Sequence, residues 1–236
     1  MKKNKSSKYW WLLSPTYKYA EQKKFELRAA NASKVAITNA LKKYNKRYFI
    51  ASIVFAIAAQ LLVSLGDYIY EPDGFYSDMY MKWIFGISVL IMCWGYLFSR
   101  AVEICKAFLE DAIEKLNGDE PTSDLKFGDR LYLSLKSYLE LIINFGTIYF
   151  LVPACFFKGK SGYDFVSILE SIYFSGVTIT TLGYGDISPS NFVLQFVTVF
   201  QVLVGFSLIV VAFAIYSNLA LSKITAEIKS AESHEK

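Results

Sequence analysis

A short polar run with two glycines lies between two apolar stretches in the C-terminal half of the chain. Residues 178–186 read Thr-Ile-Thr-Thr-Leu-Gly-Tyr-Gly-Asp. Glycine at 183 and 185 lets the backbone enter left-handed conformations at alternate residues without a Cβ penalty. The threonine hydroxyls and backbone carbonyls supply oxygen atoms of the kind that can replace the water shell of a cation, and Asp186 adds a carboxylate. The chemistry expected of this run is therefore cation binding.

The residues before the run predict a short helix that ends at it. Asp164 is suited to be the N-cap of this helix. One apolar face then follows at helical spacing, made of Phe165, Ile168, Leu169, Ile172 and Tyr173. The helix is too short to cross a bilayer, which needs about 20 residues. Non-helical backbone at membrane depth is tolerated only where it is buried in protein or lines water, so a short helix followed by glycines predicts a pore or cavity.

Four apolar spans are predicted, at residues 48–65, 83–98, 138–157 and 192–221. The chain has 236 residues, of which 54% are hydrophobic and only 19% charged. This excess is gathered into stretches: residues 141–157 and 187–222 contain no charge. The second span is short, so an interfacial or re-entrant helix is the alternative for it.

The charge distribution predicts the orientation of these spans. Residues 1–47 contain thirteen Lys or Arg against two acids, whereas the loop after the first span is mainly acidic. Basic flanks stay in the cytoplasm, so both termini are expected inside the cell and the protein in the plasma membrane. Residues 20–47 are expected to form one helix. Its lysines face anionic lipid, or alternatively it is a solvated helix that packs in the assembly.

The segment from Tyr173-Phe174-Ser175 through Thr178 to Ile187, with Pro189, resembles the pore loop of potassium channels. The resemblance covers residues from about 131 to 221. It implies a two-helix pore with a re-entrant pore helix and a filter loop, assembled as a tetrameric channel. With the two preceding spans, the expected fold is an all-α membrane protein with four transmembrane helices per subunit. The resemblance implies passive, K⁺-selective conduction, with K⁺ ions as the only bound ligand and no organic cofactor.

The resemblance also assigns roles to single residues. The backbone carbonyls of four chains surround K⁺ in that family, and the first threonine of the filter adds its hydroxyl. By this resemblance, the ligands of K⁺ are at Thr181, Leu182, Gly183 and Tyr184. Gly185 completes the filter and Asp186 lies at its outer mouth. The filter is supported from the pore helix by Tyr173, Phe174, Thr178 and Thr180.

Two further roles come from position in the inner helix. Gly205 lies where the family often has a hinge glycine, and close packing through a small residue is the alternative. Ala212, Ala214 and Ser217 are small enough to line a cytoplasmic gate.

Three departures from the family pattern involve four positions. Leu182 stands where valine is usual. Tyr173 and Phe174 replace tryptophans, and Phe174 has no donor to hold Asp186. Val177 stands where some members have an acid. The last two departures bear on inactivation of the filter, not on its selectivity.

The predicted organisation has five parts. They are a basic helical N-terminus (1–47), a two-helix transmembrane hairpin (48–98), an amphipathic helix and linker (99–130), the pore domain (131–221) and a cytosolic tail (222–236). The clearest linker is residues 118–121. In the third span, Glu140 is expected to pair with Lys136 one turn back.

Other function classes find little support in the residues. The only histidine is His234, the three cysteines form no metal-type pair, and no phosphate-binding glycine motif is present, so an enzyme is not expected. No arginine-rich sensor helix is present, which argues against steep voltage gating. No nucleic-acid partner is expected and no cytosolic regulator is identified. A weakly selective cation channel and a membrane-anchored effector or interaction protein remain the alternatives.

Overall fold

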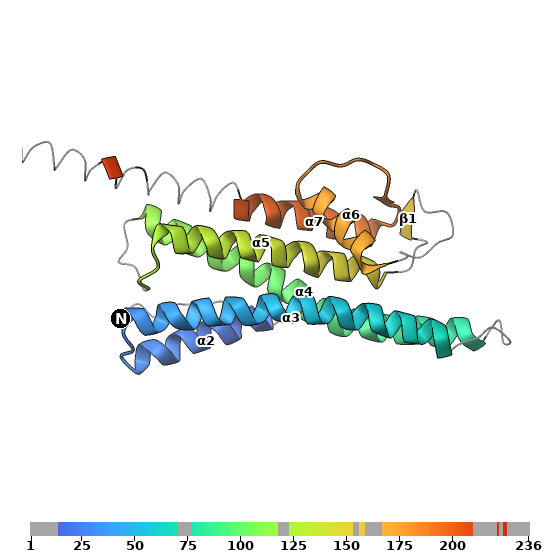
Figure 1. Cartoon of the computed structure of the whole chain (residues 1–236), viewed down its shortest axis with the longest axis horizontal. Helices are drawn as coiled ribbons and strands as arrows, with labels where there is room; N and C mark the ends of the chain where they lie inside the picture. The colour runs from blue at the N-terminus through green and yellow to red at the C-terminus, as the bar shows by residue number, and fades with distance from the viewer. Residues whose placement is uncertain are drawn as a thin grey trace, which may run out of the picture.

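The computed structural model describes residues 14–69, 77–117, 123–152, 156–158, 167–209, 221 and 224–225. Long helices dominate and run roughly along the long axis of the molecule (Figure 1). The elements of the described part are α2 (Pro15–Ala29), α3 (Lys34–Ile69), α4 (Ser77–Leu116), α5 (Phe127–Phe150), β1 (Phe157–Lys158), α6 (Ile168–Ile179), β2 (Ser188–Pro189) and α7 (Phe192–Phe206).

The N-terminal segment is two helices, so the prediction of one helix over residues 20–47 is wrong. The chain turns between α2 and α3, where Asn31 has a φ of 50°. Asparagine tolerates this left-handed conformation better than most residues. Ser33 then accepts a hydrogen bond from the backbone of Ala36 at 3.2 Å, as an N-cap does. Asn31 and Ser33 are thus the stop and start signals that separate the helices.

The long helices also differ from the predicted segment bounds. Helix α3 joins the basic segment to the first predicted span, and α4 joins the second span to the amphipathic segment. A helix that is amphipathic outside the bilayer can continue an apolar one without a break because both share the same 3.6-residue period. Helix α5 begins eleven residues before the predicted third span and ends at Phe150, because Pro153 follows closely and cannot extend a helix.

A two-residue β ladder is an addition to the expected all-α fold. β1 pairs antiparallel with β2, with Phe157 opposite Pro189 and Lys158 opposite Ser188. The backbone N–H of Ser190 also donates to the carbonyl of Phe156 at 2.8 Å. The ladder ties the segment after α5 to the segment after the glycine run.

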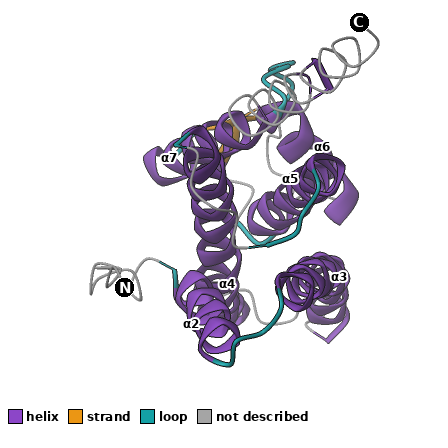
Figure 2. Cartoon of the chain, turned by 90° about the vertical axis from the view of Figure 1, so that its left-hand side faces the viewer, coloured by secondary structure: helices purple, strands orange, loops and turns teal. Residues whose placement is uncertain are grey.

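Helices α4 and α5 occupy the middle of the molecule. Viewed end-on, α2 and α3 lie on one side of them and α6 and α7 on the other (Figure 2). The largest fully buried side chains come mainly from α5 and include Tyr149, Phe145 and Leu141. Burying such side chains contributes about 1.5–3 kcal/mol each. The N-terminal helices are therefore packed against the same core that supports α6.

Two helices of the described part are long and apolar enough to cross a membrane. They are Lys34–Leu65 and Phe192–Ile209. Many apolar side chains of α3 face outward, among them Ile50, Ile57 and Leu61. An outward apolar surface of this kind is suited to contact with lipid or with another chain.

Candidate functional site

Helix α6 ends at the start of the glycine run and begins later than predicted. It starts at Ile168 with Ser167 at its N-cap, and the proposed cap Asp164 lies outside the described residues. The Ser167 side chain makes no capping hydrogen bond. Instead, Gln60 of α3 accepts a hydrogen bond from the backbone N–H of Ile168 at 2.7 Å. A residue of the N-terminal hairpin therefore caps the helix that carries the site.

The backbone of the glycine run alternates in handedness. Thr181, Gly183 and Gly185 have φ angles of 59°, 55° and 79°, respectively. The left-handed conformation at Thr181, which has a Cβ, costs about 1–3 kcal/mol. Two hydrogen bonds hold it there, from the N–H of Thr181 to the carbonyl of Thr178 at 3.0 Å and from the N–H of Leu182 to the carbonyl of Val177 at 3.1 Å. The alternation expected for the two glycines thus extends to Thr181.

Residues 181–186 lie in the loop between α6 and α7, away from α3 and α5 (Figure 1). Within the described part of the chain, no donor bonds to the carbonyl oxygens of residues 181–184. Leu182 and Tyr184 are 59% and 65% exposed. Unbonded backbone carbonyls are exceptional in folded proteins unless solvent or a ligand serves them. These carbonyls are therefore open to solvent or to a ligand, and a cation that takes carbonyl oxygens as ligands fits them.

Asp186 is held by a donor that the sequence analysis did not assign. The hydroxyl of Tyr173 donates to Asp186 Oδ2 at 3.1 Å. Phe174 itself is buried and packs edge-on against Tyr149, with ring centroids 4.9 Å apart. The aromatic pair thus divides two tasks, because Tyr173 anchors the carboxylate while Phe174 fills the space between α6 and α5.

Thr178 and Thr180, which were expected to support the run, form hydrogen bonds with neighbouring residues at the end of α6. Thr180 caps the C-terminus of α6, and its hydroxyl donates to the carbonyl of Gly176 at 2.7 Å. The carbonyl of Thr178 accepts from Thr181, as described above. These bonds fix the direction in which the chain leaves the helix.

A buried polar network behind α6 was missed by sequence reasoning. Tyr149 of α5 donates its hydroxyl proton to Gln201 Oε1 at 2.6 Å, and Gln201 Nε2 of α7 donates to the Ser175 carbonyl at 2.9 Å. Ser175 in turn donates to the Ile142 carbonyl at 2.8 Å. The one available signal was an amide, Gln201, in a long uncharged stretch, where an unpaired polar group would cost several kcal/mol.

Gly205 lies where α7 passes the end of α6. A Cβ atom added to it would collide with the side chain of Ile179, the last residue of α6. This contact favours the packing alternative for Gly205. The three candidate gate residues Ala212, Ala214 and Ser217 lie outside the described residues.

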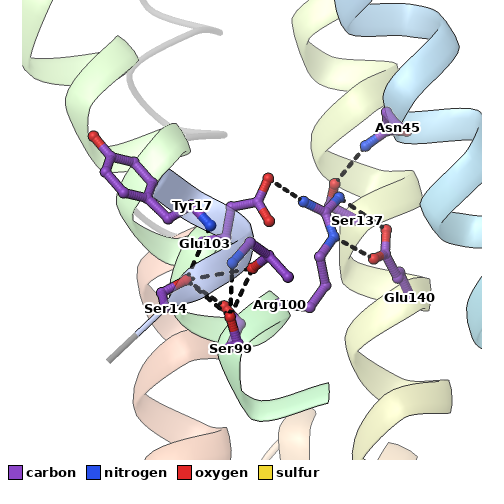
Figure 3. A network of polar contacts seen from close by, with 9 residues as sticks. Ser14, Tyr17, Asn45, Ser99, Arg100, Glu103, Ser137 and Glu140 are labelled. Atoms are coloured by element: carbon purple, nitrogen blue, oxygen red, sulfur yellow. Dashed lines mark hydrogen bonds and ion pairs between the residues drawn. The ribbon is translucent and has the colours of Figure 1, made fainter. Parts of the chain in front are cut away.

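Glu140 pairs with Arg100 of α4, so the prediction that it pairs with Lys136 is wrong (Figure 3). Arg100 Nε lies 2.7 Å from Glu140 Oε1, and Arg100 Nη1 lies 2.7 Å from Glu103 Oε1. The guanidinium also lies over the ring of Tyr48, 4.0 Å from its centroid. Arg100, Glu103 and Glu140 are all buried, and so this cluster joins α3, α4 and α5 inside the protein.

Comparison with known proteins finds one segment of the chain to be similar to a known family. Residues 137–221 match the family model of ion channels. This segment contains helix α6, the alternating run and α7. Over these residues the match confirms the predicted resemblance to the potassium channel pore family and the expectation of a channel in place of an enzyme, and together with the apolar helices it supports a membrane protein.

The chain is also similar to a curated protein over part of its length. The chain is 32% identical over 85 residues to Protein LctB of Bacillus caldotenax, an alignment that covers 33% of this chain and 63% of the relative. The chain thus spans a little under two thirds of the length of that relative. No solved structure matches the chain significantly.

Proposed function

We propose that the chain is one subunit of a homotetrameric potassium-selective channel whose filter is Thr181–Gly185. The observation that carries the proposal is the left-handed backbone at Thr181, Gly183 and Gly185. Alternation at every second residue is the geometry that lets successive carbonyls face one axis, and it supports the role expected for them in binding K⁺.

The parts around the filter have roles that follow from charge. Helix α6 ends at Ile179, directly before the filter, so its C-terminal dipole contributes about half a negative charge on the inner side. Asp186 contributes a carboxylate on the outer side, fixed by Tyr173. Both charges attract cations and repel anions. Selection among cations then depends on the carbonyl ligands of residues 181–184. Leu182 differs from the usual valine only in its side chain, so its carbonyl ligand is unchanged.

The proposed arrangement in the plasma membrane has four spanning helices, within α3, α4, α5 and α7, and both termini in the cytoplasm. It is supported by the positive charge of residues 1–47 and by the apolar length of α3 and α7. Helix α6 then enters from the outer side without crossing.

Flux through purified full-length protein in liposomes tests the function. Vesicles loaded with K⁺ and diluted into K⁺-free buffer with a protonophore, which lets H⁺ enter and balance the charge, are expected to lose K⁺ through the protein, whereas the same vesicles loaded with Na⁺ are expected to retain it. Equal K⁺ and Na⁺ flux would establish the weakly selective alternative instead. Empty liposomes control for leak.

A further inference from the structure

A basic pocket lies between α3 and α5, at their cytoplasmic ends in the proposed arrangement. It has a volume of about 280 Å³ and is lined by Lys42, Lys46, Asp129, Tyr132, Leu133 and Lys136. This volume is close to the lower end of the range of about 300–1,000 Å³ for small-molecule sites. Three lysines and one carboxylate give the pocket a net positive charge.

The charges of the pocket are arranged so that two lysines remain available. Lys42 Nζ lies 2.7 Å from Asp129 Oδ1, and this hydrogen bond lowers the pKa of the Asp129 carboxyl. Among the described residues, no carboxylate forms an ion pair with Lys46 or Lys136. Lys136 instead lies 5.4 Å from the ring centroid of Phe49. Asp129 thus occupies Lys42 and leaves the other two ammonium groups for an anion.

The start of α5 adds to this positive potential. Asp129 and Tyr132 belong to the first turns of this 24-residue helix. The N-terminus of a helix has free N–H groups and the positive end of the helix dipole, which together favour phosphate. The pocket therefore combines two lysines with a helix end of the same sign.

The surface beyond the pocket is apolar on both helices. On α3, the helical face that bears Lys42 and Lys46 continues with the outward-facing Ile50, Ile53 and Ile57. On α5, Leu135 and Leu139 are likewise exposed, one and two turns beyond Tyr132. A charged pocket that opens onto an apolar surface matches a molecule with an anionic head and hydrocarbon chains.

We propose that this pocket binds the phosphate headgroup of an anionic phospholipid from the cytoplasmic leaflet, whose acyl chains lie along α3 and α5. The assignment of the leaflet rests on the proposed membrane arrangement, whereas the phosphate chemistry rests on the pocket alone. A soluble phosphate would fill the same pocket without using the apolar surface.

Lipid binding to the purified full-length protein in detergent tests this site without any measurement of flux. The probe is dioctanoyl phosphatidic acid, compared with dioctanoyl phosphatidylcholine and with inorganic phosphate. The double variant Lys46→Gln/Lys136→Gln is expected to bind the acidic lipid about 30-fold more weakly, as two lost lysine contacts predict. The control Lys34→Gln/Lys43→Gln removes the same charge from α3 outside the pocket and is expected to retain binding.

Asp129→Asn supplies a variant with the opposite expectation. It frees Lys42 and is expected to tighten binding of the acidic lipid. Equal losses in the pocket and control variants, or unchanged binding by Asp129→Asn, would overturn the site. Displacement of the lipid by equimolar inorganic phosphate would show that the pocket binds soluble phosphate and not a phospholipid.

If the double variant fails to fold, Lys46→Gln alone is tested in its place. Because binding is read separately, a channel without K⁺ selectivity that still binds the lipid would overturn only the proposed function.

Discussion

At the scale of single residues, the backbone conformation at positions 183 and 185 requires glycine, whereas the space around them does not. An added Cβ would meet no atom within 4 Å at either position in the single chain, yet both residues have positive φ. Left-handed backbone costs a residue with a Cβ roughly 1–2 kcal/mol. Thr181 already bears this cost, which leaves little tolerance for a second strained residue in the filter.

Gly183→Ala is expected to abolish K⁺ flux in liposomes, because the strained residue relaxes and turns its carbonyl away from the axis. Gly95→Ala is the matched control, since Gly95 lies in helix α4 with no atom within 4 Å of the added Cβ. It is expected to retain flux. Retention of K⁺ flux by Gly183→Ala would show that the run is not the filter.

The buried Arg100 cluster makes a second prediction at this scale. Among the described residues, Glu140→Gln leaves Arg100 with Glu103 as its only carboxylate partner. Breaking a buried ion pair costs about 3–5 kcal/mol, and the remaining partner places the expected loss near the lower value. For a chain of this size that corresponds to a fall of roughly 6–12 °C in melting temperature, measured in detergent.

Glu26→Gln is the control for Glu140→Gln. It removes an exposed ion pair with Lys23 and is expected to leave the melting temperature unchanged, because exposed pairs contribute little. Equal effects of the two substitutions would contradict a structural role for the buried cluster.

At the scale of elements, α3 is connected to the pore helix through Gln60. Its Oε1 atom accepts the N–H of Ile168, which belongs to the first turn of α6 and has no partner within that helix. The N-terminal hairpin thereby fixes the end of α6 that is farthest from the filter. Movement of α3 would displace that end of α6.

Gln60→Leu is expected to raise the hydrogen-exchange rate of the Ile168 amide about fivefold or more, since a lost cap costs about 1 kcal/mol. Gln60→Glu retains an acceptor oxygen and adds a negative charge at the helix N-terminus, so it is expected to restore protection. Protection that is unchanged in Gln60→Leu would show that α6 is stable without this contact.

At the scale of the whole molecule, apolar side chains of α7 and of the proposed filter are left uncovered in the single chain. One face of α7 packs inward through Leu194 and Val197, whereas Phe192, Phe196, Val199, Leu203 and Phe206 are exposed. Leu182 and Tyr184 of the filter are exposed as well. A contiguous apolar face of this kind is suited to contact with lipid or with another chain, and the proposed ring of four chains would cover it.

Native mass spectrometry of the purified protein is expected to give a mass of about four times 26.8 kDa. Phe196→Glu places a charge on the exposed face of α7 and is expected to yield smaller species. Phe25→Glu introduces the same charge on an exposed position of α2 and is expected to leave the tetramer intact. A wild-type monomer or dimer would contradict the tetrameric pore.

The sequence by itself determined the chemistry of the run at residues 178–186 and the periods of the helices that surround it. The left-handed backbone conformation at Gly183 and Gly185 is a local property of residues without a Cβ. The partition of apolar spans into a membrane is a property of their composition. Neither depends on which helix lies beside which. The strained φ of Thr181 was not readable in this way, because threonine ordinarily avoids that region.

Only the tertiary structure decided which polar groups meet. Arg100 and Glu140 are 40 residues apart, Tyr149 and Gln201 are 52 apart, and Gln60 reaches Ile168 across 108. Such pairs depend on the rotation and axial register of whole helices, which are set by the packing of many apolar side chains at once. Local spacing suggested Lys136 as the partner of Glu140, but packing brought Arg100 closer.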